Sequence, residues 1–226
     1  MLELCRAIIV APTHFDSRAL AEVAMEVGFS DIASIFDDTD PGNGLRYPVS
    51  FFLVHHHLSD TDCADVIDAV RNIDRLGMRF SPMVVMLPET SAESVRKFVG
   101  MGFDDVISLP QSQVQLTARL GMQLDRDIVY IETSDYLGPD RRRMDAHGFL
   151  HRSAPVSPHS RIVLRRDPEH GTRVLSRQSR GHQHFTVAKP EPRPTAPIGL
   201  VAAAQTRVFG RRQQTPELTP AFHKDA

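Results

Sequence analysis

The stretch Phe51-Phe52-Leu53-Val54-His55-His56-His57 decides how the first half of this chain folds. Its first four residues are apolar without interruption, which is typical of a strand buried on both faces of a parallel sheet. Three histidines follow directly. Because chemistry in such sheets lies at the carboxyl ends of the strands, these histidines stand where a functional site is expected.

Strand and helix patterns alternate five times around this stretch. Short apolar runs are separated by segments whose apolar residues recur every three or four positions. This alternation predicts an α/β fold with a doubly wound, five-stranded parallel sheet. Residues 37–44 are rich in Asp, Pro and Gly and predict a loop in place of a helix. The predicted strands are residues 7–11, 32–35, 50–55, 83–87 and 106–107.

Polar residues mark the expected starts of the helices. Asp16 or Ser17 is expected to cap the first one. Thr90 and Glu93 have the spacing of a capping box ahead of the fourth helix, and a last helix is expected over residues 112–124.

The segment Gly102-Phe103-Asp104-Asp105-Val106-Ile107-Ser108-Leu109-Pro110 supplies a family resemblance. With the apolar run at 7–11, it makes residues 4–125 similar to the receiver domain of response regulators, which has a flavodoxin-like fold. We therefore expect a receiver-like domain over residues 1–126. The resemblance implies two acidic residues after the first strand, a phosphoacceptor aspartate ending the third, a Ser/Thr ending the fourth and a Lys before the last proline. In that family the three acidic residues hold Mg²⁺, and the cation and donors neutralise charge on the transferred phosphoryl group.

Each of these positions has changed in this chain. Aligned on the family pattern, Pro12 and Thr13 replace the acidic pair, and the nearby His14 and Asp16 do not restore it in that register. His55 replaces the phosphoacceptor, Leu87 the Ser/Thr and Leu109 the Lys. The resemblance therefore predicts a degenerate phosphorylation site with no catalytic residue.

The sequence pattern of the three histidines does not predict metal binding or catalysis in place of phosphorylation. Successive residues of a strand point to opposite faces, so only His55 and His57 are expected to share one. Neither a Cys nor an Asp is placed by the sequence to complete a zinc site, and we expect no metal and no cofactor. No nucleophile–base pair or carboxylate pair has credible spacing, so an enzyme is not expected.

The second part of the chain differs in composition and charge. Residues 1–136 contain 10 Lys/Arg and 21 Asp/Glu, a difference of −11, whereas residues 137–226 contain 16 and 7, a difference of +9. Ten of the 16 prolines follow Tyr136, and no apolar period is sustained there. We expect residues 127–136 to form an extra strand or linker and residues 137–226 to be a largely disordered basic tail, loosely attracted to the acidic body.

Gly138-Pro139-Asp140 predicts a turn, and Arg141, Arg142 and Arg143 follow it. Clustered guanidinium groups suit a phosphate-rich ligand that contains guanine, so a cyclic dinucleotide is one possible partner. The other interpretation is a basic segment that packs on the acidic body or on a protein partner.

Two functions follow from these patterns. The first is a non-phosphorylatable pseudo-receiver that binds a signalling protein in a bacterial two-component-type system. The alternative is an effector that responds to cyclic di-GMP or another nucleotide. No helix-turn-helix pattern follows residue 126, so DNA is not an expected partner. No apolar run is long enough to span a membrane, and Cys5 and Cys63 show no metal spacing, so a reducing cytoplasmic setting is expected. The oligomeric state stays open.

Overall fold

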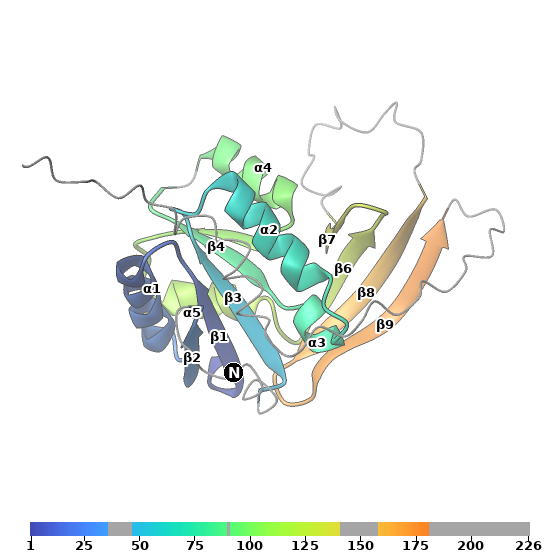
Figure 1. Cartoon of the computed structure of the whole chain (residues 1–226). Helices are drawn as coiled ribbons and strands as arrows, with labels where there is room; N and C mark the ends of the chain where they lie inside the picture. Colours follow the sequence, from blue (N-terminus) through green and yellow to red (C-terminus); the bar gives the residue numbers. More distant parts are fainter. Residues whose placement is uncertain (36–46, 90, 141–157, 181–226) are drawn as a thin grey trace, which may run out of the picture.

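The computed structural model describes residues 1–35, 47–89, 91–140 and 158–180. Arg141, Arg142 and Arg143, the predicted 37–44 loop and the C-terminal residues 181–226 lie outside the described residues. Within the described part, a five-stranded parallel sheet and a four-stranded antiparallel sheet lie side by side (Figure 1).

The parallel sheet confirms the fold class that the sequence predicts. Its strand order is β2-β1-β3-β4-β5, and every neighbouring pair is parallel. The central strands β1, β3 and β4 are buried along almost their whole length, as their uninterrupted apolar runs require. The strands are β1 (Cys5–Val10), β2 (Asp31–Ser34), β3 (Val49–His55), β4 (Met83–Leu87) and β5 (Asp105–Ser108), and a short 3-10 helix, Leu2–Leu4, precedes β1.

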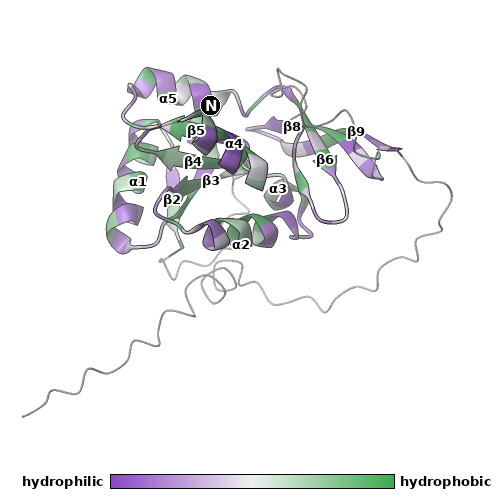
Figure 2. Cartoon of the chain, turned by 90° about the horizontal axis from the view of Figure 1, so that it is seen from above, coloured by the Kyte–Doolittle hydropathy of each residue, from purple (hydrophilic) through white to green (hydrophobic). Residues whose placement is uncertain are grey.

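Helices cover both faces of this sheet (Figures 1 and 2). On one face, α1 (His14–Glu26) and α5 (Gln113–Gly121) bury Leu20 and Leu116 against the strands. On the other, α2 (Asp60–Arg71) and α4 (Ala92–Met101) bury Val66 and Phe98. A further short helix, α3 (Leu76–Arg79), which the sequence did not predict, leads into β4.

The helix caps differ in detail from the sequence expectation. Thr13, and not Asp16 or Ser17, caps α1, because its hydroxyl accepts a hydrogen bond from the Asp16 backbone N–H. Ser91 caps α4 by accepting from the Ser94 backbone N–H, one residue after the expected cap at Thr90, which lies outside the described residues. A true capping box lies instead at the start of α5, between Ser112 and Gln115.

The second sheet includes part of residues 137–226, which the sequence predicts to be a largely disordered tail. Residues 137–139 and 159–180 form three of its four strands, in the order β7-β6-β8-β9 and antiparallel throughout. The predicted turn at Gly138-Pro139 is also wrong, because both residues belong to an edge strand, where a proline is tolerated. The strands are β6 (Asp127–Glu132), β7 (Leu137–Pro139), β8 (His159–Asp167) and β9 (Gly171–Arg180).

Apolar contacts attach the second sheet to the first. Tyr130 of β6 and Ile162 and Leu164 of β8 are at most 2% exposed and pack with Phe80, which precedes β4. The rings of Phe80 and Tyr130 meet edge to face with their centroids 5.4 Å apart. Burial of each such side chain contributes about 1.5–3 kcal/mol, so the two sheets share a core.

A buried polar network completes this junction. Arg166 of β8 is fully buried and donates to the carbonyl of Phe80, to Gln123 Oε1, to the Tyr130 hydroxyl and to Asp104 Oδ1. Asp104 Oδ2 accepts from Arg71 and from the Met83 backbone N–H. The expected loose contact between body and tail is therefore wrong for β8, whose arginine is held at the amino ends of β4 and β5. Among the described residues, no helix is long and apolar enough to cross a membrane.

Candidate functional site

The carboxyl ends of the parallel strands form the edge at which the family resemblance places a site. The structure puts the five predicted positions there: Pro12 and Thr13 follow β1, His55 ends β3, Leu87 ends β4 and Leu109 follows β5. His55 pairs with Met86 of the neighbouring strand, and the Leu109 backbone N–H donates to the Leu87 carbonyl at 2.7 Å. The fold thus brings these positions to one edge.

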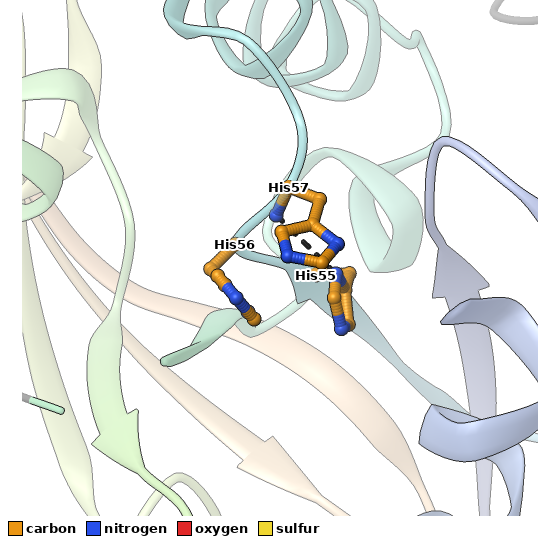
Figure 3. Close-up of side chains that lie close together, drawn as sticks. All are labelled: His55, His56 and His57. Atoms are coloured by element: carbon orange, nitrogen blue, oxygen red, sulfur yellow. Dashed lines mark hydrogen bonds between the residues drawn. The ribbon is translucent and has the colours of Figure 1, made fainter. Parts of the chain in front are cut away.

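The three histidines cluster at this edge (Figure 3). β3 ends at His55, and the chain turns there, with the Leu58 backbone N–H donating to the His55 carbonyl at 3.1 Å. The ring centroids lie 4.4 Å apart for His55 and His56, 4.6 Å for His55 and His57, and 4.2 Å for His56 and His57. The expectation that neighbouring histidines point to opposite faces is wrong, because it assumed that the strand continues.

Asp16 joins this cluster from the first turn of α1. Its Oδ1 lies 3.2 Å from His57 Nδ1 and 3.8 Å from His55 Nε2, and its side chain is only 10% exposed. Thr13 fixes the carboxylate, because its hydroxyl donates to Asp16 Oδ2 at 2.7 Å while accepting from the Asp16 backbone N–H. The family pattern does not include Asp16, because this residue lies outside the register of the acidic pair. The Thr-x-x-Asp spacing of a helix cap was the signal that could have placed it.

The charges in the cluster follow from burial and from these contacts. Burial and the neighbouring His56 lower the pKa of His55 to about 4, although Asp16 acts in the opposite direction. Burial and His57 also lower the pKa of His56. Burial by itself raises the Asp16 pKa, but the Thr13 hydroxyl and the histidines lower it on balance. At neutral pH, Asp16 is therefore an anion beside neutral His55 and His56.

The two remaining family positions are apolar. Leu87 is 5% exposed and belongs to the core under α2 and α4, so no hydroxyl ends β4. Leu109 packs against the core under α1 and α5. The nearest hydroxyl in the chain, on Ser108, accepts a hydrogen bond from Gln111 at 3.3 Å. Neither leucine can donate to a phosphoryl oxygen.

The donor set at this edge does not fit Mg²⁺. This cation takes six oxygen ligands in nearly octahedral geometry. In the part of the chain that the structure describes, the cluster offers the Asp16 carboxylate and imidazole nitrogens, and Pro12 and His55 supply no carboxylate in place of the family's acidic residues. The magnesium site that the resemblance implies is therefore not formed by these residues.

Comparisons with known proteins return solved structures alone, since no family model and no curated protein matches the chain. One is the receiver domain of a sensor histidine kinase from Pseudomonas aeruginosa PAO1, described with a magnesium ion in its active-site cleft. It has 11% identity and a TM-score of 0.35, and the match covers 52% of this chain and 94% of that one. Another is a response regulator in red light signaling of R. palustris, with 15% identity and a TM-score of 0.35, covering 51% and 87%.

Proposed function

We propose that this chain is a non-phosphorylatable pseudo-receiver that binds a protein partner in bacterial two-component-type signalling. The observation that carries the proposal is the replacement of the phosphoacceptor by His55 at the end of β3, beside leucines at both switch positions. Phosphoryl transfer to a receiver needs a carboxylate nucleophile, a bound cation and a donor to the transferred oxygens. In the described part of the chain, the strand ends at this edge carry Pro12, His55, Leu87 and Leu109 where such groups are expected.

A basic sheet face supports a protein-binding role. Along β8, Ile162, Leu164 and Arg166 point to the shared core, so Arg161 and Arg165 lie on the opposite face. In the register with β9, Arg165 stands opposite Arg173. Like charges opposite each other on a sheet are destabilising, which favours a role other than stability for this pair.

The arginines of this face differ in their partners. Arg165 pairs with Asp127 at 2.5 Å, and Arg173 pairs with Asp167 at 3.3 Å. Arg161 and Arg180, which flank the open end of the β8–β9 pair, form no salt bridge with another described residue. Bidentate guanidinium groups suit carboxylates, so the partner surface that fits this face is acidic protein.

Phosphorylation of the purified full chain tests the degenerate site. We expect incubation with acetyl phosphate and Mg²⁺ to leave the intact mass unchanged. The variant His55→Asp is expected to stay unmodified too, because Pro12 and Thr13 still supply no carboxylate for the cation. An acid-labile phosphoryl adduct on the wild-type chain would overturn the proposal.

Capture from native cell extract with matched variants tests the binding face. We expect Arg161→Glu/Arg180→Glu to lose an acidic partner that the wild-type chain retains. The control Arg18→Glu/Arg96→Glu changes the net charge equally, on helices α1 and α4 of the parallel sheet, and is expected to keep the partner. Equal loss of the partner in both variants would show that binding depends on net charge alone and not on this face. Saturable binding of cyclic di-GMP in calorimetry would favour the nucleotide effector over the interaction module.

A further inference from the structure

Each of the three histidine rings has a hydrogen bond at one side, to a carboxylate or to the backbone. Asp16 Oδ1 accepts from His57 Nδ1, because a carboxylate only accepts, which leaves Nε2 as the nitrogen not used in this hydrogen bond. His56 has a hydrogen bond to the Met86 backbone, and its ring centroid lies 4.4 Å from that of His55 and 4.2 Å from that of His57. Two rings are thus each held by a hydrogen bond.

His55 completes the pattern. Its Nδ1 accepts a hydrogen bond from the His57 backbone N–H at 3.2 Å, so its proton sits on Nε2, the nitrogen that faces Asp16 at 3.8 Å. All three rings therefore direct their N–H groups at a carboxylate or at the backbone. Histidines that bind metals almost always donate their other ring N–H in this way, which fixes the tautomer and the ring orientation.

We propose that His55, His56 and His57 bind one transition-metal ion of the Zn²⁺ type, with Asp16 as the carboxylate behind the ligands. One ligand atom from each ring lies within 4.8 Å of the other two. A tetrahedral Zn²⁺ with Zn–N bonds of about 2.0–2.1 Å separates its ligand atoms by roughly 3.3 Å. Side-chain rotation closes this difference, since the His57 side chain is 58% exposed and sits in a turn.

The site needs one hydrogen bond to be exchanged. The His55 Nδ1 lone pair that accepts from the His57 backbone N–H is the one that would bind the metal, so that N–H turns away when the ion enters. Three imidazoles leave a fourth position for water or an anionic ligand, as in other three-histidine zinc sites. Imidazole ligands favour Zn²⁺ over Mg²⁺, which separates this site from the oxygen-ligand site of the resemblance.

Titration calorimetry and native mass spectrometry with Zn²⁺ alone test this site on the metal-stripped full chain. We expect one Zn²⁺ per chain at the cluster, not displaced by excess Mg²⁺. Replacing the three histidines by Gln abolishes this binding, and His56→Gln alone, which disturbs the turn less, weakens it. Asp16→Asn is expected to weaken it about 10–100-fold, as loss of an outer carboxylate does.

The control variant is His182→Gln/His184→Gln, which removes two histidines elsewhere in the chain and is expected to keep the ion. Loss of binding in this control with retention in the triple variant would show adventitious binding elsewhere and overturn the proposal. No bound Zn²⁺ in a wild-type chain that melts cooperatively would do the same. The phosphodonor experiment has a separate readout, so either proposal can fail without the other.

Discussion

Arg166 is the residue through which the second sheet is fixed to the first. It is fully buried, and its guanidinium group reaches backbone, amide, hydroxyl and carboxylate acceptors from four other positions along the chain. A buried charge that loses its partner destabilises the fold far more than an exposed one. The neighbouring residues Arg165 and Arg166 of β8 therefore contribute very differently to stability.

Replacing each of these arginines measures that difference. Arg166→Met leaves Asp104 buried with Arg71 as its single remaining guanidinium partner, and we expect it to lower the free energy of unfolding by about 3–5 kcal/mol. Its matched control, Arg165→Met, breaks a pair with Asp127 whose side chains are 45% and 52% exposed, at a cost of about 0–1 kcal/mol. Urea denaturation of the full chain compares them, and equal costs would contradict the buried network.

The pH dependence of stability gives a second view of Asp104. Burial by itself raises its pKa, but Arg166 and Arg71 lower it on balance below its ordinary value of 3.8. A depressed carboxyl pKa stabilises the folded state above the unfolded-state value, and the contribution is lost as pH falls through the folded-state value. We expect Asp104→Asn to be much less stable than the wild type at pH 7, and the gap to narrow below about pH 4. A gap independent of pH would show that the charge is not involved.

At the scale of elements, β8 is a strand that the sequence pattern does not predict. Ser160, Ile162, Leu164 and Arg166 alternate inward, but only two of them are apolar, so the period-two signal of a half-buried strand is weak. From sequence alone, an arginine at such a position is predicted to be exposed to solvent unless its buried partner is known. That partner, Asp104, lies 62 residues earlier, and no local pattern announces it.

The elements with uninterrupted apolar runs were predicted correctly for the opposite reason. β1, β3 and β4 are buried on both faces, and their residues need no distant partner to be recognised. The histidine cluster falls between these cases. Its position at the end of β3 followed from the sequence, whereas the turn after His55 and the contact with Asp16 depend on α1 and could not be read locally.

Limited proteolysis of the full chain tests the revised element boundaries. We expect residues 159–180 to resist cleavage together with the parallel sheet, because β8 and β9 are paired along their length and β8 is buried. Removing everything after residue 140 should lower the melting temperature of the rest, since Phe80, Tyr130 and Asp104 then lose their β8 partners. Cleavage within β8 before any loss of the parallel sheet would contradict a shared core.

At the scale of the whole molecule, the acidic and basic parts of the chain are joined in one fold through β8 and β9. Residues 159–180 of the basic part do not form a loose tail, because they are built into the fold as β8 and β9. The most buried of its arginines neutralises an acidic residue of the parallel sheet. The exposed arginines remain on the outer face, where we propose that an acidic partner binds.

The pseudo-receiver that we propose is expected to keep one state across its whole surface. In the family, phosphorylation shifts a two-state surface formed by the fourth helix, fifth strand and fifth helix. Here Arg119 of α5 already binds Asp105 through two hydrogen bonds and the Val106 carbonyl through a third, which ties α5 to β5. We therefore expect amide hydrogen exchange over residues 91–124 to be the same with and without acetyl phosphate and Mg²⁺. Arg119→Ala is the matched control, in which exchange at the start of β5 and along α5 rises in both conditions. If hydrogen exchange in the wild-type chain changes with the phosphodonor, the chain responds to it although no carboxylate occupies the end of β3, and the proposal is contradicted.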